Sequence, residues 1–143
     1  MALGDSWIGQ AINALETGPE WSSTAILLTW DDCGCFYDSV PPPPSSNLGI
    51  RVPMILISPW VIPGHTDSTV ATSASILAFA EHTLGLPPLS TTDQNAYDYF
   101  GSFNFGQTAA AIKGHRVTLK VSPEPPSSKA WIKRHPPDTD DPT

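Results

Sequence analysis

Apolar residues recur along the first half of the chain with two different periods. Between Ser6 and Glu16 they are three or four positions apart, which predicts an amphipathic helix that ends before Gly18. Residues 24–30 and 52–58 are nearly continuous apolar runs, the pattern of strands buried on both faces. This order of elements predicts an α/β fold, with a mostly parallel sheet flanked by helices.

The helical period returns in residues 72–84, and Gly85 with two later prolines marks the end of that segment. Residues 91–100 are typical of a short capped helix, and the alternation in 116–121 predicts a lone edge strand. Two core strands are few for a sheet that is covered on both faces. The sequence therefore predicts an incomplete domain whose uncovered sheet edge and apolar face promote association.

Composition separates the end of the chain from the rest. The chain has 143 residues and 16 prolines, and from residue 122 onward prolines and polar residues leave few apolar anchors. Such a segment cannot offset its own ordering entropy, so 122–143 is predicted to be a disordered Pro-rich tail. Residues 1–106 then form the domain, and 107–121 are an extension that the pattern does not assign.

Charge and hydropathy argue against some classes of function but do not determine where in the cell the protein acts. The net charge of −7 argues against nucleic acid as a partner, because phosphate binding needs a basic face. No apolar run reaches the ~20 residues of a membrane span. The first residues also lack the basic and then apolar pattern of a signal peptide.

The candidate chemistry lies where the first predicted strand ends. Asp31 and Asp32 follow that strand directly, and Gly34 permits a backbone turn that could bring the two carboxylates together. Converging carboxylates repel each other unless a divalent cation, a basic group or one raised pKa relieves the repulsion. Alternatively, aspartates at a strand end cap backbone N–H groups. The long Pro-rich loop that follows, 34–49, is typical of a functional segment.

Other polar residues near this loop have two interpretations each. Arg51 could form an ion pair with Asp38 or Asp31 and hold the loop, or it could bind phosphate. Cys33 and Cys35 are too close in sequence for an unstrained disulfide, so we expect free thiols, with a soft-metal site as the weaker alternative. His65, in the loop after the second strand, is either simply exposed or turned toward the site.

Four further residues are expected to have structural roles. Phe36 and Tyr37 are expected to pack under the Pro-rich loop, and Trp30 is expected to lie in the core. His82 is expected to interact with the C-terminal end of the helix over 72–84 and not with substrate.

Several short blocks of sequence occur in an order that is characteristic of one family. The blocks are Pro19-Glu20-Trp21-Ser22-Ser23-Thr24-Ala25, Thr29-Trp30-Asp31-Asp32, Phe36-Tyr37-Asp38, Gly49-Ile50-Arg51-Val52-Pro53, Ile57-Ser58-Pro59 and Ser75-Ile76-Leu77-Ala78-Phe79-Ala80-Glu81. Together they strongly resemble the phosphoesterase family of bacterial phospholipases C and acid phosphatases, in the alkaline-phosphatase-like superfamily. The resemblance runs from Gly4 to about Phe105 and matches the C-terminal part of that family's catalytic domain, which implies a partial alkaline-phosphatase-like fold.

The resemblance implies metal-dependent hydrolysis of a phosphate ester, in which an activated hydroxyl takes the phosphoryl group and water releases it. In the family the two acidic residues after the strand are metal ligands, a role that falls here on Asp31 and Asp32. The family's nucleophile and remaining ligands lie in its N-terminal part. We therefore expect this chain alone to be inactive and to need such an N-terminal half. The residues expected to support the ligands or contact substrate are Gly34, Tyr37, Asp38, Ser39, Arg51 and His65.

Departures from the family pattern support an alternative function. Where relatives usually have Gly-Gly-Phe-Tyr-Asp-His-Val, this chain has Cys35 for the second Gly and Ser39 for His. The loss of an imidazole removes a proton carrier or phosphate contact, and Cys35 adds a Cβ in the turn. The alternative is a non-catalytic remnant that binds at most a divalent cation or a partner.

Overall fold

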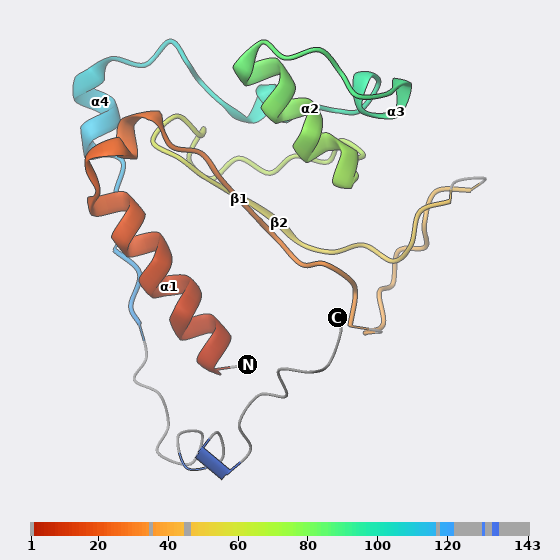
Figure 1. Cartoon of the computed structure of the whole chain (residues 1–143), viewed down its shortest axis with the longest axis horizontal. Coiled ribbons are helices and arrows are strands. Elements are labelled where there is room, and N and C mark those ends of the chain that lie inside the picture. Colours follow the sequence, from red (N-terminus) through yellow and green to blue (C-terminus); the bar gives the residue numbers. More distant parts are fainter. Residues whose placement is uncertain are drawn as a thin grey trace. The chain divides into compact units, whose positions relative to one another are not determined.

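The computed structural model describes residues 2–34, 36–44, 47–116, 118–121, 130 and 133–134 (Figure 1). The chain divides into two compact units, Met1–Trp21 with Arg116–Thr143, and Ser22–His115. The elements, in chain order, are α1 (Ala2–Thr17), the 3-10 helix η1 (Pro19–Ser23), β1 (Ile26–Thr29), β2 (Met54–Ile57), α2 (Ser73–Leu84), α3 (Thr91–Gln94), the 3-10 helix η2 (Phe100–Ser102) and α4 (Ala109–Gly114).

The first unit is built on α1, which confirms the predicted helix and starts earlier than predicted. Its buried positions, among them Ser6, Ile12 and Glu16, recur at helical spacing and so share one face. Asn13 holds the later segment of this unit with both of its amide atoms. Its Nδ2 donates to the Leu119 carbonyl (3.0 Å), and the Leu119 N–H donates to its Oδ1 (2.8 Å).

The predicted edge strand at 116–121 is not formed by the residues of that range that the structure describes. A side chain, Asn13, takes the hydrogen bonds that a neighbouring strand would have made. The predicted tail, 122–143, lies almost wholly outside the described residues. In the described part of the chain, no helix combines the length and the apolar character needed to cross a membrane.

The second unit contains both strands, which pair with each other in an antiparallel sheet. The register places Ile26 opposite Ile57 and Thr29 opposite Met54. The mostly parallel sheet predicted from the sequence is not seen among the described residues. Parallel neighbours need a crossover connection, usually through a helix, whereas the described part of the 30–53 connection contains none. The alkaline-phosphatase-like fold stays a prediction.

An aromatic core joins α2 to this sheet. Phe79 of α2 is 7% exposed and its ring packs on the Phe103 ring, with the centroids 5.1 Å apart. Leu27 of β1 and Leu56 of β2 pack against the same cluster. Figure 1 shows α2 beside the strand pair, as these contacts require. The core is one-sided, because the strand residues are only partly buried, where burial on both faces was predicted.

The ends of the helices in this unit follow local rules. The predicted helix over 72–84 is confirmed, and Gly85 ends it in the left-handed conformation with φ of 65°. The short helix α3 is capped by Ser90, whose hydroxyl accepts the Thr92 N–H (3.1 Å). The Asp93 carboxylate in turn accepts the Ser90 N–H (3.1 Å), which completes a capping box.

Candidate functional site

The two predicted metal ligands lie in a turn directly after β1. The Oδ1 of Asp31 accepts the N–H of Asp32 (3.0 Å), and the Oδ1 of Asp32 accepts the N–H of Gly34. Gly34 has φ of 55°, so it supplies the left-handed turn that the sequence predicts. Both carboxylates are exposed. The capping interpretation is therefore confirmed, and it engages one oxygen of each carboxylate.

The donor type at this turn suits a hard divalent cation, but the number of donors is small. Carboxylate oxygens are the ligands that such cations prefer, and about six are needed in total. Among the described residues, no group of three or more His, Cys, Asp or Glu side chains is placed to hold a metal. Two carboxylates supply only part of such a coordination shell.

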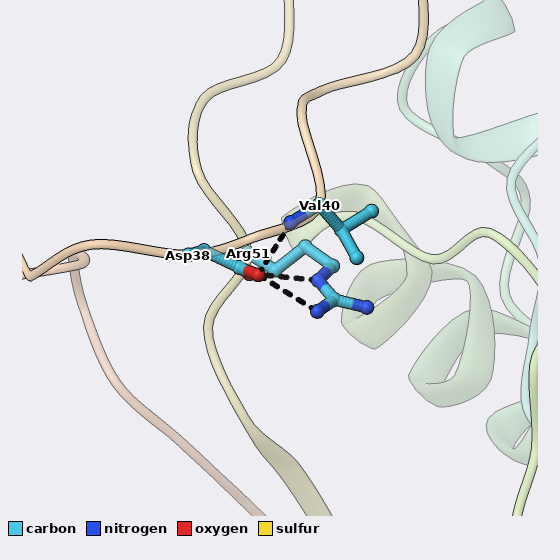
Figure 2. Close-up of polar contacts among 3 residues, drawn as sticks. All are labelled: Asp38, Val40 and Arg51. Atoms are coloured by element: carbon cyan, nitrogen blue, oxygen red, sulfur yellow. Dashed lines mark hydrogen bonds and ion pairs between the residues drawn. The ribbon is translucent and has the colours of Figure 1, made fainter.

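The loop that follows is held by an ion pair between Asp38 and Arg51 (Figure 2). Arg51 Nε donates to Asp38 Oδ2 (2.8 Å) and Nη2 donates to Oδ1 (2.9 Å). The N–H of Val40 also donates to Oδ1 (2.9 Å). Of the two partners predicted for Arg51, the structure thus selects Asp38. A shallow, open cavity of about 330 Å³ lies here, lined by Asp38, Arg51, Val52 and Pro53.

These contacts change the acidity of both groups. The Arg51 guanidinium, helped by the Val40 N–H, lowers the pKa of the Asp38 carboxyl to about 2. The Asp38 carboxylate raises the pKa of Arg51 in return. Both groups are therefore charged at neutral pH, and Arg51 is committed to a carboxylate in this structure.

The other predicted residues of this loop are exposed. Tyr37 is 91% exposed and Phe36 is 69% exposed, although both were expected to pack under the Pro-rich loop. Trp30, expected in the core, is 44% exposed. These three predictions were wrong because none of the described segments covers this face of the turn. Ser39 is also exposed, Cys33 is partly exposed and forms no disulfide with a described residue, and Cys35 lies outside the described residues.

His65 is exposed in the loop after β2, as one of its two interpretations predicted. Its N–H donates to the Ile62 carbonyl (3.2 Å) in a turn. The observed contacts of His82 differ from the expected contact with the C-terminal end of α2. Its Nδ1 lies 2.7 Å from Asp98 Oδ2, and its ring stacks on Phe100 with the centroids 4.1 Å apart.

Sequence reasoning missed a polar cluster around Asp67, in the same loop as His65. The Tyr97 hydroxyl donates to Asp67 Oδ2, the Ser102 hydroxyl donates to the same oxygen (3.1 Å), and the Thr69 N–H donates to Oδ1 (2.8 Å). These donors hold the pKa of Asp67 well below its usual range, the Tyr97 hydroxyl most strongly. Burial, and then Asp67, raise the pKa of Tyr97. Tyr97 and Ser102 are 30 or more positions from Asp67, so no local pattern marks these two contacts.

Together the fold and the site define a mixed helix and sheet chain that presents adjacent carboxylates at the end of a strand. Residues 1–87 match the model of the Phosphoesterase family, and the chain belongs to this family. It is 33% identical to Non-specific phospholipase C1 of Arabidopsis thaliana over 82 residues, which cover 45% of this chain and 15% of that protein.

Two bacterial proteins show the same relationship. The Non-hemolytic phospholipase C of Pseudomonas aeruginosa is 29% identical over a 179-residue alignment that covers 90% of this chain and 25% of that protein. The Hemolytic phospholipase C of the same organism is 30% identical over 110 residues, 59% of this chain and 15% of that protein. The chain therefore spans only 15% to 25% of the length of these relatives.

Proposed function

We propose that this chain contributes Asp31 and Asp32 as metal ligands to an enzyme that hydrolyses phosphate esters, of the phospholipase C or acid phosphatase type. The observation that carries the proposal is the pair of adjacent, exposed carboxylates in the turn after β1. The family match over residues 1–87 and the relatives named phospholipase C support it.

The two aspartates would act as oriented oxygen donors. Each uses Oδ1 to accept a backbone N–H of the turn, which fixes the carboxylate relative to the end of β1. The structure shows no hydrogen bond from a described residue to either Oδ2, so these oxygens are open to a cation. A bound divalent cation supplies positive charge for the transferring phosphoryl group and lowers the pKa of a hydroxyl nucleophile.

No residue of this chain is proposed as the nucleophile. We propose that the nucleophile and the remaining metal ligands come from an N-terminal half of the catalytic domain, whether it belongs to the same polypeptide or to another. The exposed carboxylate pair and the exposed Phe36 and Tyr37 beside it would then face that half. The substrate proposed for the assembled site is a phosphate ester.

Titration of the 143-residue chain with Mn²⁺ tests the ligand assignment. The double variant Asp31→Asn, Asp32→Asn should bind Mn²⁺ more weakly than the parent chain does, because amide oxygens carry no charge to offset the dehydration of the cation. The sequence offers a matched control in Asp140 and Asp141, a second adjacent pair whose replacement by Asn changes the net charge equally. Equal Mn²⁺ affinity of the two double variants would refute the assignment.

A chimera tests the activity. Residues 1–87 of this chain would replace the matching segment of the Pseudomonas aeruginosa Non-hemolytic phospholipase C, and hydrolysis of p-nitrophenyl phosphorylcholine would be measured. Loss of a residue that merely supports a ligand costs about 10 to 100-fold, so Asp31→Asn or Asp32→Asn should cost at least about 100-fold. Asp5→Asn, at an exposed carboxylate of α1, is the control and should leave turnover unchanged.

A second candidate function is the non-catalytic remnant, which binds at most a divalent cation or a partner. Two observations favour it: Cys35 and Ser39 depart from the family pattern, and the described residues contain no three-ligand metal group. The same chimera decides between the candidates. Turnover with the native Cys35 and Ser39 rules the remnant out. Turnover only after Cys35→Gly and Ser39→His would establish it.

A further inference from the structure

We propose that the Asp38–Arg51 ion pair positions the carboxylates of Asp31 and Asp32, by closing the loop that carries them. The inference rests on the proposed function of those two aspartates as cation ligands. In this role Asp38 and Arg51 are positioning residues, which act through the loop and touch neither cation nor substrate.

The first step concerns the base of the loop. The connection between β1 and β2 runs from residue 30 to residue 53, 24 residues in all. At its two ends the Thr29 hydroxyl donates to the Pro53 carbonyl (2.7 Å), one position before the first residue of β2. This hydrogen bond and the direct step from Pro53 into β2 attach the segment that contains Arg51 and Pro53 to the end of the sheet.

The second step concerns how the ion pair divides the connection. Asp38, bound to Arg51, is held near the sheet by a residue only two positions from Pro53. The carboxylates of Asp31 and Asp32 then lie on a closed segment, residues 30–37, which is eight residues long. Without the ion pair, the same carboxylates lie on the full connection of 24 residues.

The third step is that this ion pair is strong enough to hold the loop. Exposed ion pairs usually contribute little, but a bidentate pair of Arg with a carboxylate is the favourable geometry. Figure 2 shows both guanidinium bonds and the Val40 N–H converging on one carboxylate. The Asp38 side chain is 17% exposed and that of Arg51 is 61% exposed. Three donors thus orient a largely covered acceptor.

The size of the effect follows from the two segment lengths. The probability that the ends of a flexible segment meet falls as about the 3/2 power of its length. A threefold longer segment therefore holds the carboxylates in place about fivefold less often. Loss of the ion pair should speed amide exchange in the turn, and weaken Mn²⁺ binding by the chain, about fivefold.

Amide hydrogen exchange of the metal-free chain tests the positioning without any reference to catalysis. In Asp38→Asn and in Arg51→Gln, the amides of Asp32 and Gly34 should exchange about fivefold faster than in the parent. His82→Asn is the matched control, because it removes a polar side-chain contact elsewhere in this unit, that of His82 with Asp98. Unchanged exchange at Asp32 and Gly34 in both loop variants would overturn the proposal.

Two further variants separate the ion pair from a general weakening of the loop. The exchanged pair Asp38→Arg, Arg51→Asp restores the bidentate geometry and should recover most of the parent's slow exchange. Arg51→Lys keeps the charge without the planar fork and should recover only part of it. No recovery in the exchanged pair would refute the role of the ion pair.

Mn²⁺ affinity, measured on the same variants, separates this inference from the proposed function. A fivefold weaker affinity in Asp38→Asn together with faster exchange supports both. Faster exchange in the variants, together with a parent chain that binds no Mn²⁺, supports the closing of the loop and refutes the cation role. Weaker binding with unchanged exchange refutes the positioning.

Discussion

The substitution Tyr97→Phe removes one hydroxyl group and keeps the ring. That hydroxyl donates to Asp67 Oδ2, the oxygen that also accepts from Ser102 (3.1 Å). Through these contacts Asp67, in the loop after β2, is attached to the segment around η2. The ring contact between Tyr97 and Tyr99, with centroids 5.4 Å apart, survives the substitution, so the change isolates a hydrogen bond from packing.

The magnitude follows from the charge and the exposure of the acceptor. A hydrogen bond to a charged group contributes about 1.5 to 3 kcal/mol, and competition from water lowers this value at an exposed site. Asp67 is exposed, whereas Tyr97 is partly buried. We therefore expect Tyr97→Phe to lower the free energy of unfolding by about 1 kcal/mol. No cavity contribution is added, because only an oxygen atom is removed.

Urea denaturation followed by tryptophan fluorescence measures this loss. For a chain of this size the denaturant slope is about 1 to 3 kcal/mol per molar urea, so the midpoint should fall by about 0.3 to 1 M. Tyr37→Phe is the matched control, since Tyr37 is 91% exposed and its variant should stay within about 0.5 kcal/mol of the parent. Equal midpoints for Tyr97→Phe and Tyr37→Phe would refute the reasoning.

The same variant has a predictable dependence on pH. The pKa of Asp67 is held well below its usual range in the folded chain, chiefly by the Tyr97 hydroxyl. The stability that this shift contributes is complete above the unfolded pKa of about 4 and is lost as pH falls through the folded value. The difference between the parent and Tyr97→Phe should therefore be full at neutral pH and shrink below about pH 4. A difference that persists unchanged in strong acid would contradict this assignment.

Three further predictions concern other parts of the second unit. Gly85→Ala should destabilise the chain by about 1 to 2 kcal/mol in thermal or urea unfolding, because Gly85 has φ of 65°, where a Cβ is strained. Gly49→Ala is the control and should change stability little, because Gly49 has no positive φ and an added Cβ would meet no atom within 4 Å. The Asp38–Arg51 ion pair should persist as the pH falls past the usual carboxyl pKa of about 4 and be lost as the pH falls through about 2, because the pKa of Asp38 is lowered to about 2; a carboxyl chemical shift titrated by NMR measures this, and a midpoint near 4 would contradict it. Exposed apolar side chains such as those of Ile55 and Leu77 should make the chain associate in size-exclusion chromatography with light scattering, and a single monomeric peak would show otherwise.

Local features of the fold could be predicted from the sequence. The helix over 72–84 and its end at Gly85 depend on neighbouring residues and on the left-handed conformation that glycine adopts readily. The turn at Gly34 depends on the same property. The ion pair of Arg51 with Asp38 could be proposed as one of two options, because its partners are 13 positions apart on one loop.

Features that depend on distant segments could not be predicted. The pairing direction of β1 and β2 was expected to be parallel, since continuous apolar runs resemble strands buried on both faces. The contact of Asp67 with Tyr97 joins residues 30 positions apart and leaves no periodic signal. Tyr37 was expected to be packed, but its exposure depends on whether another segment covers it.

The sequence by itself therefore determined the helices α1 and α2, the two strands, the acidic pair after the first strand and the family of the chain. These features depend on side-chain periodicity and on the conformational freedom of single residues, which act over a few positions. Only the tertiary structure decided the antiparallel pairing, the choice of Asp38 by Arg51 and the acidity of Asp67. Each of these depends on which groups meet in space, and folding brings them together from positions that no local pattern relates.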